Sequence, residues 1–158
     1  MKILFFLLSY LALTTNASPI ESVDASPPES PYTSDKACWL GWWSVFIYDA
    51  INDPIPITVH VQSKEDDLGN HTLAYNDNTN WKFCVSSGAR TRFYAHFYWK
   101  SRTAFFDVYD YDTAETYCAG SNTFKQQNCF WSVRDNGFYI SRHNNPFPEG
   151  WTKLHDWS

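Results

Sequence analysis

Short runs of strictly alternating apolar and polar residues constrain this chain most, and the clearest extends from Arg90 to Lys100. Successive side chains of a β-strand point to opposite faces of its sheet, so this period indicates one buried and one solvent-facing side. The apolar phase consists of Thr91, Phe93, Ala95, Phe97 and Trp99. The polar phase consists of Arg92, Tyr94, His96, Tyr98 and Lys100. The run therefore predicts an amphipathic strand.

Further short runs of strand character follow one another between turn residues, and no stretch shows a convincing helical period. Aromatic residues, which favour strands, make up 19% of the chain. The other predicted strands are Trp42–Tyr48, Ile57–Gln62, His71–Tyr75, Asn80–Val85, Ala104–Asp110, Cys129–Arg134 and Phe138–Arg142. Several short strands at this spacing predict an all-β fold, a small antiparallel β-sandwich.

The strongest turn signal lies between the last two predicted strands, at Asp135-Asn136-Gly137. Asn-Gly is typical of a type I′ turn, because both central residues of that turn have positive φ. We therefore expect a β-hairpin across these residues.

The N-terminal segment indicates export from the cell. Lys2 is followed by the apolar run 3–13 and by small residues around Ala17, a pattern typical of a secretory signal peptide. Residues 1–17 are predicted to be that signal, and the Pro/Ser-rich residues 18–37 a flexible arm. The globular domain is then expected at 38–158, with no membrane insertion, because no later segment is apolar for long enough to span a bilayer.

The net charge and the number of cysteines limit which ligands and which cysteine chemistry we expect. The formal net charge of −5 argues against nucleic-acid binding, which relies on clustered Lys and Arg. In an oxidising compartment the four cysteines predict two disulfides, and three connectivities are open. Zinc is the competing interpretation, but no two cysteines form a close C-x-x-C pair. The cysteines are Cys38, Cys84, Cys118 and Cys129.

An acidic turn closed by a glycine follows the alternation of Ile57–Gln62. Lys64, Glu65, Asp66 and Asp67 cannot continue a buried row, so we expect a charged loop, Lys64–Asn70, at the surface. Three interpretations remain: a solvated turn, a partner-binding surface, or a calcium site, for which the run supplies too few oxygens. Asn70 also begins the sequon Asn-His-Thr and is a candidate glycosylation site.

A second candidate surface is the polar phase of the clearest strand. Arg92, Tyr94, His96 and Tyr98 would share one face with further cations nearby, which gives a basic aromatic strip on an acidic protein. The strip can meet an acidic receptor loop or a glycan, or it is the ordinary solvent face of a sheet. The cations that fall between Asp77 and Asp107 are Lys82, Arg90, Arg92, Lys100 and Arg102.

The residues give no support for catalysis. Asp107, Asp110, Asp112 and Glu115 invite comparison with glycosidases, but nothing marks one carboxyl as a buried acid distinct from a base. No nucleophile elbow accompanies the five scattered histidines. We therefore expect a non-enzymatic protein without a cofactor.

Five blocks, in order and spacing, resemble the plant self-incompatibility S-protein homologue family over roughly Trp43–Trp151. The blocks are VHVQSKEDDLG, WKF at 81–83, RFYAHFYW at 92–99, FFDVYD at 105–110 and CFWSVRDNGFY at 129–139. The resemblance implies a small secreted, disulfide-bonded β-sandwich with no known enzymatic activity. Founding members are ligands secreted by the stigma, and they distinguish self pollen from non-self pollen.

The resemblance also bears on the cysteines. Relatives usually carry cysteine at the places of Val61 and Ala95, so this chain has apolar residues at both. Cys118 and Cys129 match the family's later pair and are expected to bond to each other. Cys38 and Cys84 then remain as a second, displaced disulfide.

The leading functional hypothesis is a secreted, monomeric signalling-type ligand that binds a cell-surface protein receptor through the loops between its strands. Its process would be self-incompatibility or another plant cell-cell recognition process. The alternatives are a carbohydrate-binding, lectin-like protein that uses exposed aromatic residues, and a secreted defence or effector protein on the same scaffold.

Overall fold

The computed structural model describes residues 38, 41–85, 91–122 and 125–158. The expected signal peptide (1–17) and arm (18–37) lie outside the described residues, as does Arg90. Over the described residues, no helix has both the length and the apolar character that crossing a membrane requires.

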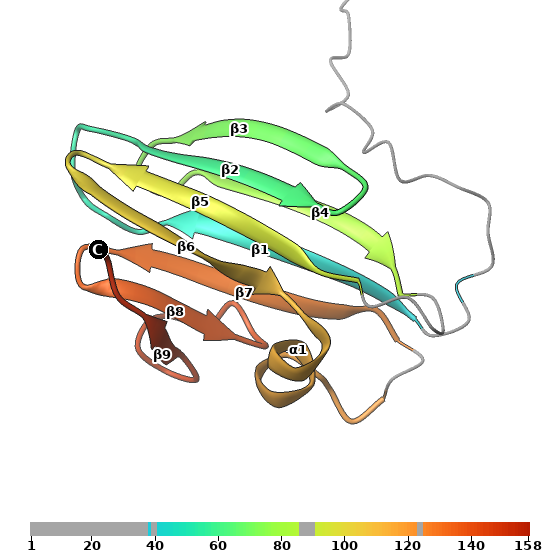
Figure 1. Ribbon diagram of the computed structural model, residues 1–158. Helices are drawn as coiled ribbons and strands as arrows, with labels where there is room; N and C mark the ends of the chain where they lie inside the picture. Colours follow the sequence, from blue (N-terminus) through green and yellow to red (C-terminus); the bar gives the residue numbers. More distant parts are fainter. Residues whose placement is uncertain (1–37, 39–40, 86–90, 123–124) are drawn as a thin grey trace, which may run out of the picture.

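The described chain forms two packed β-sheets, as the alternating runs predict (Figure 1). One sheet has five strands in the order β4-β1-β7-β8-β9, and the other has four in the order β3-β2-β5-β6. The expected β-sandwich fold is thereby confirmed. The strands are β1 (Trp42–Asp49), β2 (Ile57–Ser63), β3 (Asp67–Leu73), β4 (Asn78–Cys84), β5 (Phe93–Trp99), β6 (Arg102–Tyr109), β7 (Gln127–Arg134), β8 (Gly137–Ser141) and β9 (Thr152–His155).

One strand pair departs from the expected antiparallel pattern, because β1 and β7 run parallel, with Val45 opposite Cys129. A parallel pair needs a long crossover connection. Here the crossover is the long segment between β1 and β7, which forms β4 and all four strands of the other sheet. Side-chain alternation has the same period in both kinds of pairing, so it could not reveal the direction.

The core lies between the two sheets and consists of the inward phases of their strands. Val61 and Ala95 are directly opposite each other on β2 and β5, and both are fully buried. Trp131 on β7 is also fully buried, and its indole N–H donates to the Val108 carbonyl of the other sheet at 2.9 Å. Burying one large apolar side chain contributes about 1.5–3 kcal/mol, so these positions carry much of the stability.

A short helix, α1 (Tyr111–Tyr117), corrects the expectation that the chain has no helix. Asp110 caps its N-terminus, since the carboxylate accepts a hydrogen bond from the Thr113 amide at 2.9 Å. Seven residues make only two turns, and Ala114 alone is buried. A helix with a single buried residue has no readable period, which explains why the sequence pattern missed it.

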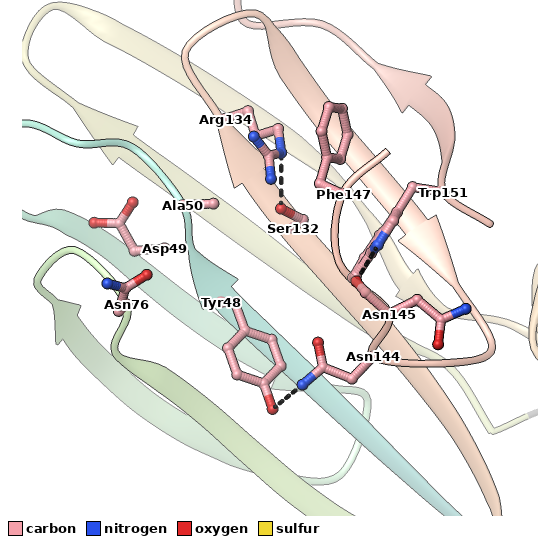
Figure 2. Close-up of a pocket in the computed structure, with 10 residues that line it drawn as sticks. All are labelled: Tyr48, Asp49, Ala50, Asn76, Ser132, Arg134, Asn144, Asn145, Phe147 and Trp151. Carbon is pink, nitrogen blue, oxygen red and sulfur yellow. Dashed lines mark hydrogen bonds between the residues drawn. The ribbon is translucent and has the colours of Figure 1, made fainter. Parts of the chain in front are cut away.

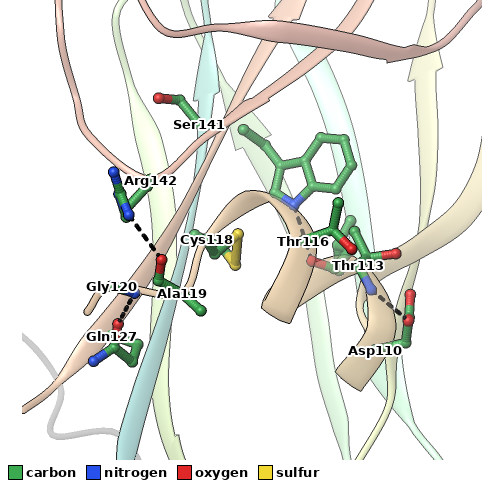
Figure 3. Close-up of a disulfide and its surroundings, with 12 residues drawn as sticks. Asp110, Thr113, Thr116, Cys118, Ala119, Gly120, Gln127, Ser141 and Arg142 are labelled. Carbon is green, nitrogen blue, oxygen red and sulfur yellow. Dashed lines mark hydrogen bonds between the residues drawn. A yellow bond between two sulfur atoms is a disulfide. The ribbon is translucent and has the colours of Figure 1, made fainter. Parts of the chain in front are cut away.

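Two disulfides link Cys118 to Cys129 and Cys38 to Cys84, the pairs that the family resemblance implies. The first ties the end of α1 to β7, as Figure 3 shows. The second connects the segment before β1 to the end of β4. The sequence separations are 11 and 46 residues. The chain-entropy model gives about 3 and about 4 kcal/mol of stabilisation for loops of these lengths.

The β7–β8 hairpin forms where Asn-Gly predicts it, but its turn is not type I′. The two turn residues are Asp135 and Asn136, and Gly137 already pairs with Arg134. Gly137 has a φ of 130°, whereas Asn136 does not adopt positive φ. A Cβ at 137 would lie 2.4 Å from the carbonyl oxygen of His155 in β9, a strand that the sequence did not predict. The glycine is therefore required for the close approach of β9.

Candidate recognition surface

The turn between β2 and β3 is shorter than the expected charged loop. Only Lys64, Glu65 and Asp66 lie between the two strands. The Ser63 hydroxyl accepts hydrogen bonds from the Glu65 and Asp66 amides at 3.2 and 2.9 Å, and the Ser63 amide donates to the Asp66 carbonyl. These bonds hold a tight turn in which Lys64 and Glu65 are exposed to solvent.

Asp67, expected in the loop, is instead the first residue of β3, and its carboxylate organises the hairpin. Its Oδ1 lies 2.7 Å from the His60 ring nitrogen and accepts from the Gly69 amide at 2.8 Å. Its Oδ2 accepts from the Gln62 amide side chain at 3.3 Å. The Gly69 amide, and then His60, lower the pKa of Asp67. Asp67 therefore holds the hairpin together.

An aromatic cluster covers the outer face of the four-stranded sheet, and we call Tyr94, His96, Tyr98 and Phe105 the aromatic face. His96 stacks on Phe105 with ring centroids 4.2 Å apart, and Tyr94 meets Phe105 edge-on at 5.7 Å. The rings of His96 and Tyr98 are parallel at 6.4 Å. Phe105 is 60% exposed and Tyr98 is 45% exposed, so the cluster presents apolar surface to solvent.

Strand register decides which of the expected site residues lie together. Tyr94 is opposite Gln62, beside the β2–β3 turn, whereas Tyr98 is opposite Thr58 at the other end of β2. The structure therefore brings the acidic turn close to Tyr94 and places Tyr98 far along the same face. His96 lies between them and is opposite His60.

The cations of the predicted basic strip do not form one continuous charged surface. Arg92 pairs with Asp107 at 2.6 Å, which raises the pKa of the guanidinium. Lys100 pairs with Asp53 at 2.5 Å, outside the aromatic face. Arg102 donates to the Asp135 carbonyl, and Lys82 belongs to the other sheet, where it lies over the Trp42 ring. Of the strip, Arg92 alone among the described cations adjoins Tyr94.

Asn70 of the sequon is exposed in the middle of β3, which is the edge strand of the sheet. It is directly opposite His60, which is in turn opposite His96 on β5 and, through it, Phe105 on β6. Directly opposed residues of antiparallel strands share a face. A glycan on Asn70 would therefore project from the edge of the aromatic face.

The carboxylates that invited comparison with glycosidases have structural roles or are spread over α1. Asp107 pairs with Arg92, and Asp110 caps α1. Asp112 lies in the first turn of α1, where its charge suits the helix dipole, and Glu115 is exposed on the same helix. Within the described ranges, no three His, Cys, Asp or Glu side chains are grouped so that they could hold a metal ion.

Phe105 is the surface residue that sequence reasoning missed. The sequence predicts a strand over Ala104–Asp110, but the alternation within that segment alone does not show which of its faces is the outer one. The β5–β6 hairpin turns at Lys100 and Ser101, because Trp99 pairs with Arg102, and this register places Phe105 opposite His96. Counting outward from that turn would have placed Phe105 on the outer face.

Comparison with known proteins gives one consistent result. The model of the family described as plant self-incompatibility protein S1 matches residues 44–157. S-protein homolog 2 of Arabidopsis thaliana is 27% identical over 135 residues, which cover 85% of this chain and 81% of the relative. S-protein homolog 3 of the same plant is 32% identical over 99 residues, 63% of each chain.

A solved structure of similar fold is an SPH (Self-Incompatibility Protein Homologue) protein. It aligns with a TM-score of 0.55 and 16% identity, over 77% of this chain and 98% of that chain. It is described as one of a widespread family of small, highly stable, secreted proteins from plants. At this identity the likeness concerns the fold.

Proposed function

The chain belongs to the plant self-incompatibility protein S1 family, and from this premise we propose that it is a secreted, non-enzymatic ligand for a cell-surface receptor protein. The apolar run after Lys2 and the secreted relative of the same fold support secretion. The process would be self-incompatibility or another form of plant cell-cell recognition.

The observation that carries this proposal is the exposed aromatic face beside the β2–β3 turn. Interface centres are enriched in aromatic residues and depleted in charge, and a polar rim surrounds them. Phe105 and His96 form such an apolar centre, and Glu65 and the Arg92–Asp107 pair supply charge at one end. Phe105 is 60% exposed and adjoins Tyr94 and His96, so it belongs to a contiguous apolar patch, which is typical of an interaction site.

Rigid support strengthens the proposal. The aromatic face stands on β5, whose inward residues Ala95 and Phe97 are buried, and on β6, whose inward residues Ala104 and Val108 are buried. The turn is fixed by Ser63 and Asp67. A surface that is ordered before binding loses little conformational entropy on association.

Binding of the labelled protein to intact plant cells tests the proposal. We expect saturable binding that disappears when the cells are first treated with a protease. Phe105→Ala should weaken it at least about tenfold, the effect of losing an interface hot spot. Glu65→Lys should chiefly change the association rate, because rim charges steer encounter.

Tyr75→Ala is the matched control, because Tyr75 is 46% exposed but lies outside the aromatic face. This variant should bind like the unchanged protein. Equal losses for Tyr75→Ala and Phe105→Ala would refute a specific role for the aromatic face. Binding that survives protease but is abolished by Tyr94→Ala and Tyr98→Ala would favour the lectin-like alternative.

A further inference from the structure

The outer face of the five-stranded sheet holds a pocket that the proposed function does not use. It has a volume of about 270 Å³ and lies between β1, β7 and the segment that follows β8 (Figure 2). Its walls combine aromatic rings with amides, a hydroxyl and one guanidinium. The lining residues that matter here are Tyr48, Ser132, Arg134, Asn144, Phe147 and Trp151.

Arg134 is the cation of this pocket, and it forms no ion pair with a described residue, although the charge of the adjacent Asp135 acts on it. The Phe147 ring centre lies 3.5 Å from its guanidinium carbon, and its Nε donates to the Ser132 hydroxyl at 3.2 Å. None of the four ion pairs among the described residues includes Arg134, and no described acceptor is bonded to its two terminal nitrogens. Burial lowers the pKa of this guanidinium. The structure thus fixes a half-buried cation whose terminal N–H groups have no acceptor among the described residues.

Asp49 also lines the pocket but does not neutralise Arg134. Its side chain belongs to the inward phase of β1, where it is 1% exposed, and its Oδ1 accepts from the Ile51 amide at 2.8 Å. Of the residues lining the pocket in the described chain, Arg134 alone is cationic. A single guanidinium balances the charge of one carboxylate and can form two parallel hydrogen bonds with it.

The other walls of the pocket are oriented by hydrogen bonds. Trp151 donates its indole N–H to the Asn145 carbonyl at 2.9 Å, and the Asn144 amide side chain lies 3.5 Å from the Tyr48 hydroxyl. Figure 2 shows these groups around the same opening as Arg134 and Phe147. Fixed rings together with a few polar groups are typical of small-ligand sites.

A shelf of three rings continues the pocket along the sheet. We define the aromatic shelf as Phe46, Tyr48 and Phe130, all on the outward phase of β1 and β7. Phe46 stacks on Phe130 at 4.9 Å and on Tyr48 at 6.4 Å, with interplanar angles of 19° and 17°. The amides of Asn80 and Asn78 stand opposite Phe46 and Tyr48 on β4. The shelf therefore offers a stack of nearly parallel rings with hydrogen-bonding groups alongside.

We propose that the pocket and the aromatic shelf bind an acidic oligosaccharide. A sugar carboxylate accepts two hydrogen bonds from the terminal nitrogens of Arg134, and the C–H groups of neighbouring sugars pack against the stacked rings of the shelf. Hydroxyl groups meet the side-chain amides of Asn78, Asn80 and Asn144. This site lies on the opposite sheet from the aromatic face and is independent of receptor binding there.

Calorimetric titration with an oligomer of galacturonic acid tests the site, with the same oligomer fully methyl-esterified as the neutral comparison. We expect the acidic oligomer to bind and the esterified one to bind at least about tenfold more weakly, because the charge-assisted bonds to Arg134 are lost. Arg134→Gln should cause a loss of similar size. Arg134→Lys should fall between, since lysine keeps the charge but lacks the planar fork.

Arg92→Gln is the matched control, because it makes the same chemical change on the other sheet and gives the same net charge. It should bind the acidic oligomer like the unchanged protein. The fold should survive Arg134→Gln, since the bond from Trp157 goes to the backbone carbonyl of Arg134; a thermal melt of each variant checks this. Lack of binding by the unchanged protein, equal affinity for the esterified oligomer, or equal losses in Arg92→Gln and Arg134→Gln would each overturn the proposal.

Discussion

The two sheets share one core but differ in how they are cross-linked. Both disulfides attach to the five-stranded sheet, through Cys84 on β4 and Cys129 on β7. The four-stranded sheet contains no cysteine. At the two positions where the family resemblance implies cysteines, this chain places Val61 directly opposite Ala95, and both are fully buried. One sheet of the sandwich is therefore held without covalent cross-links, whereas disulfides brace the other.

The outer faces of the two sheets differ in their charges. On the four-stranded sheet, Asp67 and Arg92 are both engaged with neighbouring side chains, and the exposed rings are left apolar. On the five-stranded sheet, Arg134 has a phenylalanine over it and forms none of the four ion pairs among the described residues. The first face suits a protein surface, and the second suits a small acidic ligand.

The largest expected effect comes from breaking the core that both sheets share. Trp131→Ala removes a fully buried indole and its bond to Val108 in the facing sheet. We expect the free energy of unfolding to fall by about 3–5 kcal/mol. Urea denaturation followed by intrinsic fluorescence measures it. Phe105→Ala should change the same quantity by less than about 0.5 kcal/mol, because the ring is exposed. Comparable losses in both variants would contradict the assignment of core and surface.

A new disulfide should give the four-stranded sheet a covalent cross-link like those of the five-stranded sheet. Val61→Cys combined with Ala95→Cys places two thiols opposite each other on β2 and β5. Closing this loop should add about 2–4 kcal/mol to the free energy of unfolding. Denaturation with and without a reductant, compared with each single variant, measures the gain. If the oxidised double variant is no more stable than its reduced form, the two positions are not matched as the register indicates.

Asp67, at the acidic end of the aromatic face, should make the stability of the fold depend on pH. Hydrogen bonds from the Gly69 amide, and then from His60, lower the pKa of Asp67 in the folded protein. A carboxyl with a lowered folded pKa stabilises the fold above its unfolded pKa, and this contribution is lost as pH falls through the folded value. The midpoint of thermal unfolding should therefore drop below about pH 4 by more in the unchanged protein than in Asp67→Asn. Glu65→Gln, which alters an exposed turn residue, should keep the full drop.

The smallest expected effect concerns Asn70. A glycan there would stand in solvent at the sheet edge, so Asn70→Gln should change the free energy of unfolding by less than about 0.5 kcal/mol. We expect intact-mass measurement of protein secreted from plant cells to show one glycan that this variant lacks. If the unchanged protein has the mass of the unmodified chain, Asn70 carries no glycan.

Side-chain alternation predicted the faces of the strands well, because burial follows directly from a period of two. It gave Phe93, Ala95 and Phe97 to the core, and all three are buried. It could not give pairing direction, so the parallel pair β1 and β7 was missed. The strand β9 was missed because it has no buried residue and is defined by its pairing with β8.

The candidate site was predicted less completely than the fold, because its composition depends on register between strands. The charged turn was found, yet a tight hairpin drew Asp67 into β3. The basic strip was read from one stretch of sequence, whereas the partners of its cations come from distant segments, as Asp53 does for Lys100. The pocket at Arg134 gave no sequence signal at all, since Phe147 and Asn144 reach it from beyond β8.

The central claim is that each outer face has its own ligand, and a crossed binding measurement tests it most directly. Phe105→Ala and Arg134→Gln are each assayed on intact plant cells and on the galacturonic acid oligomer. We predict that Phe105→Ala loses only cell binding and Arg134→Gln loses only oligomer binding, each at least about tenfold. If either variant lost both activities while its unfolding midpoint stayed unchanged, the two faces would not be separate sites.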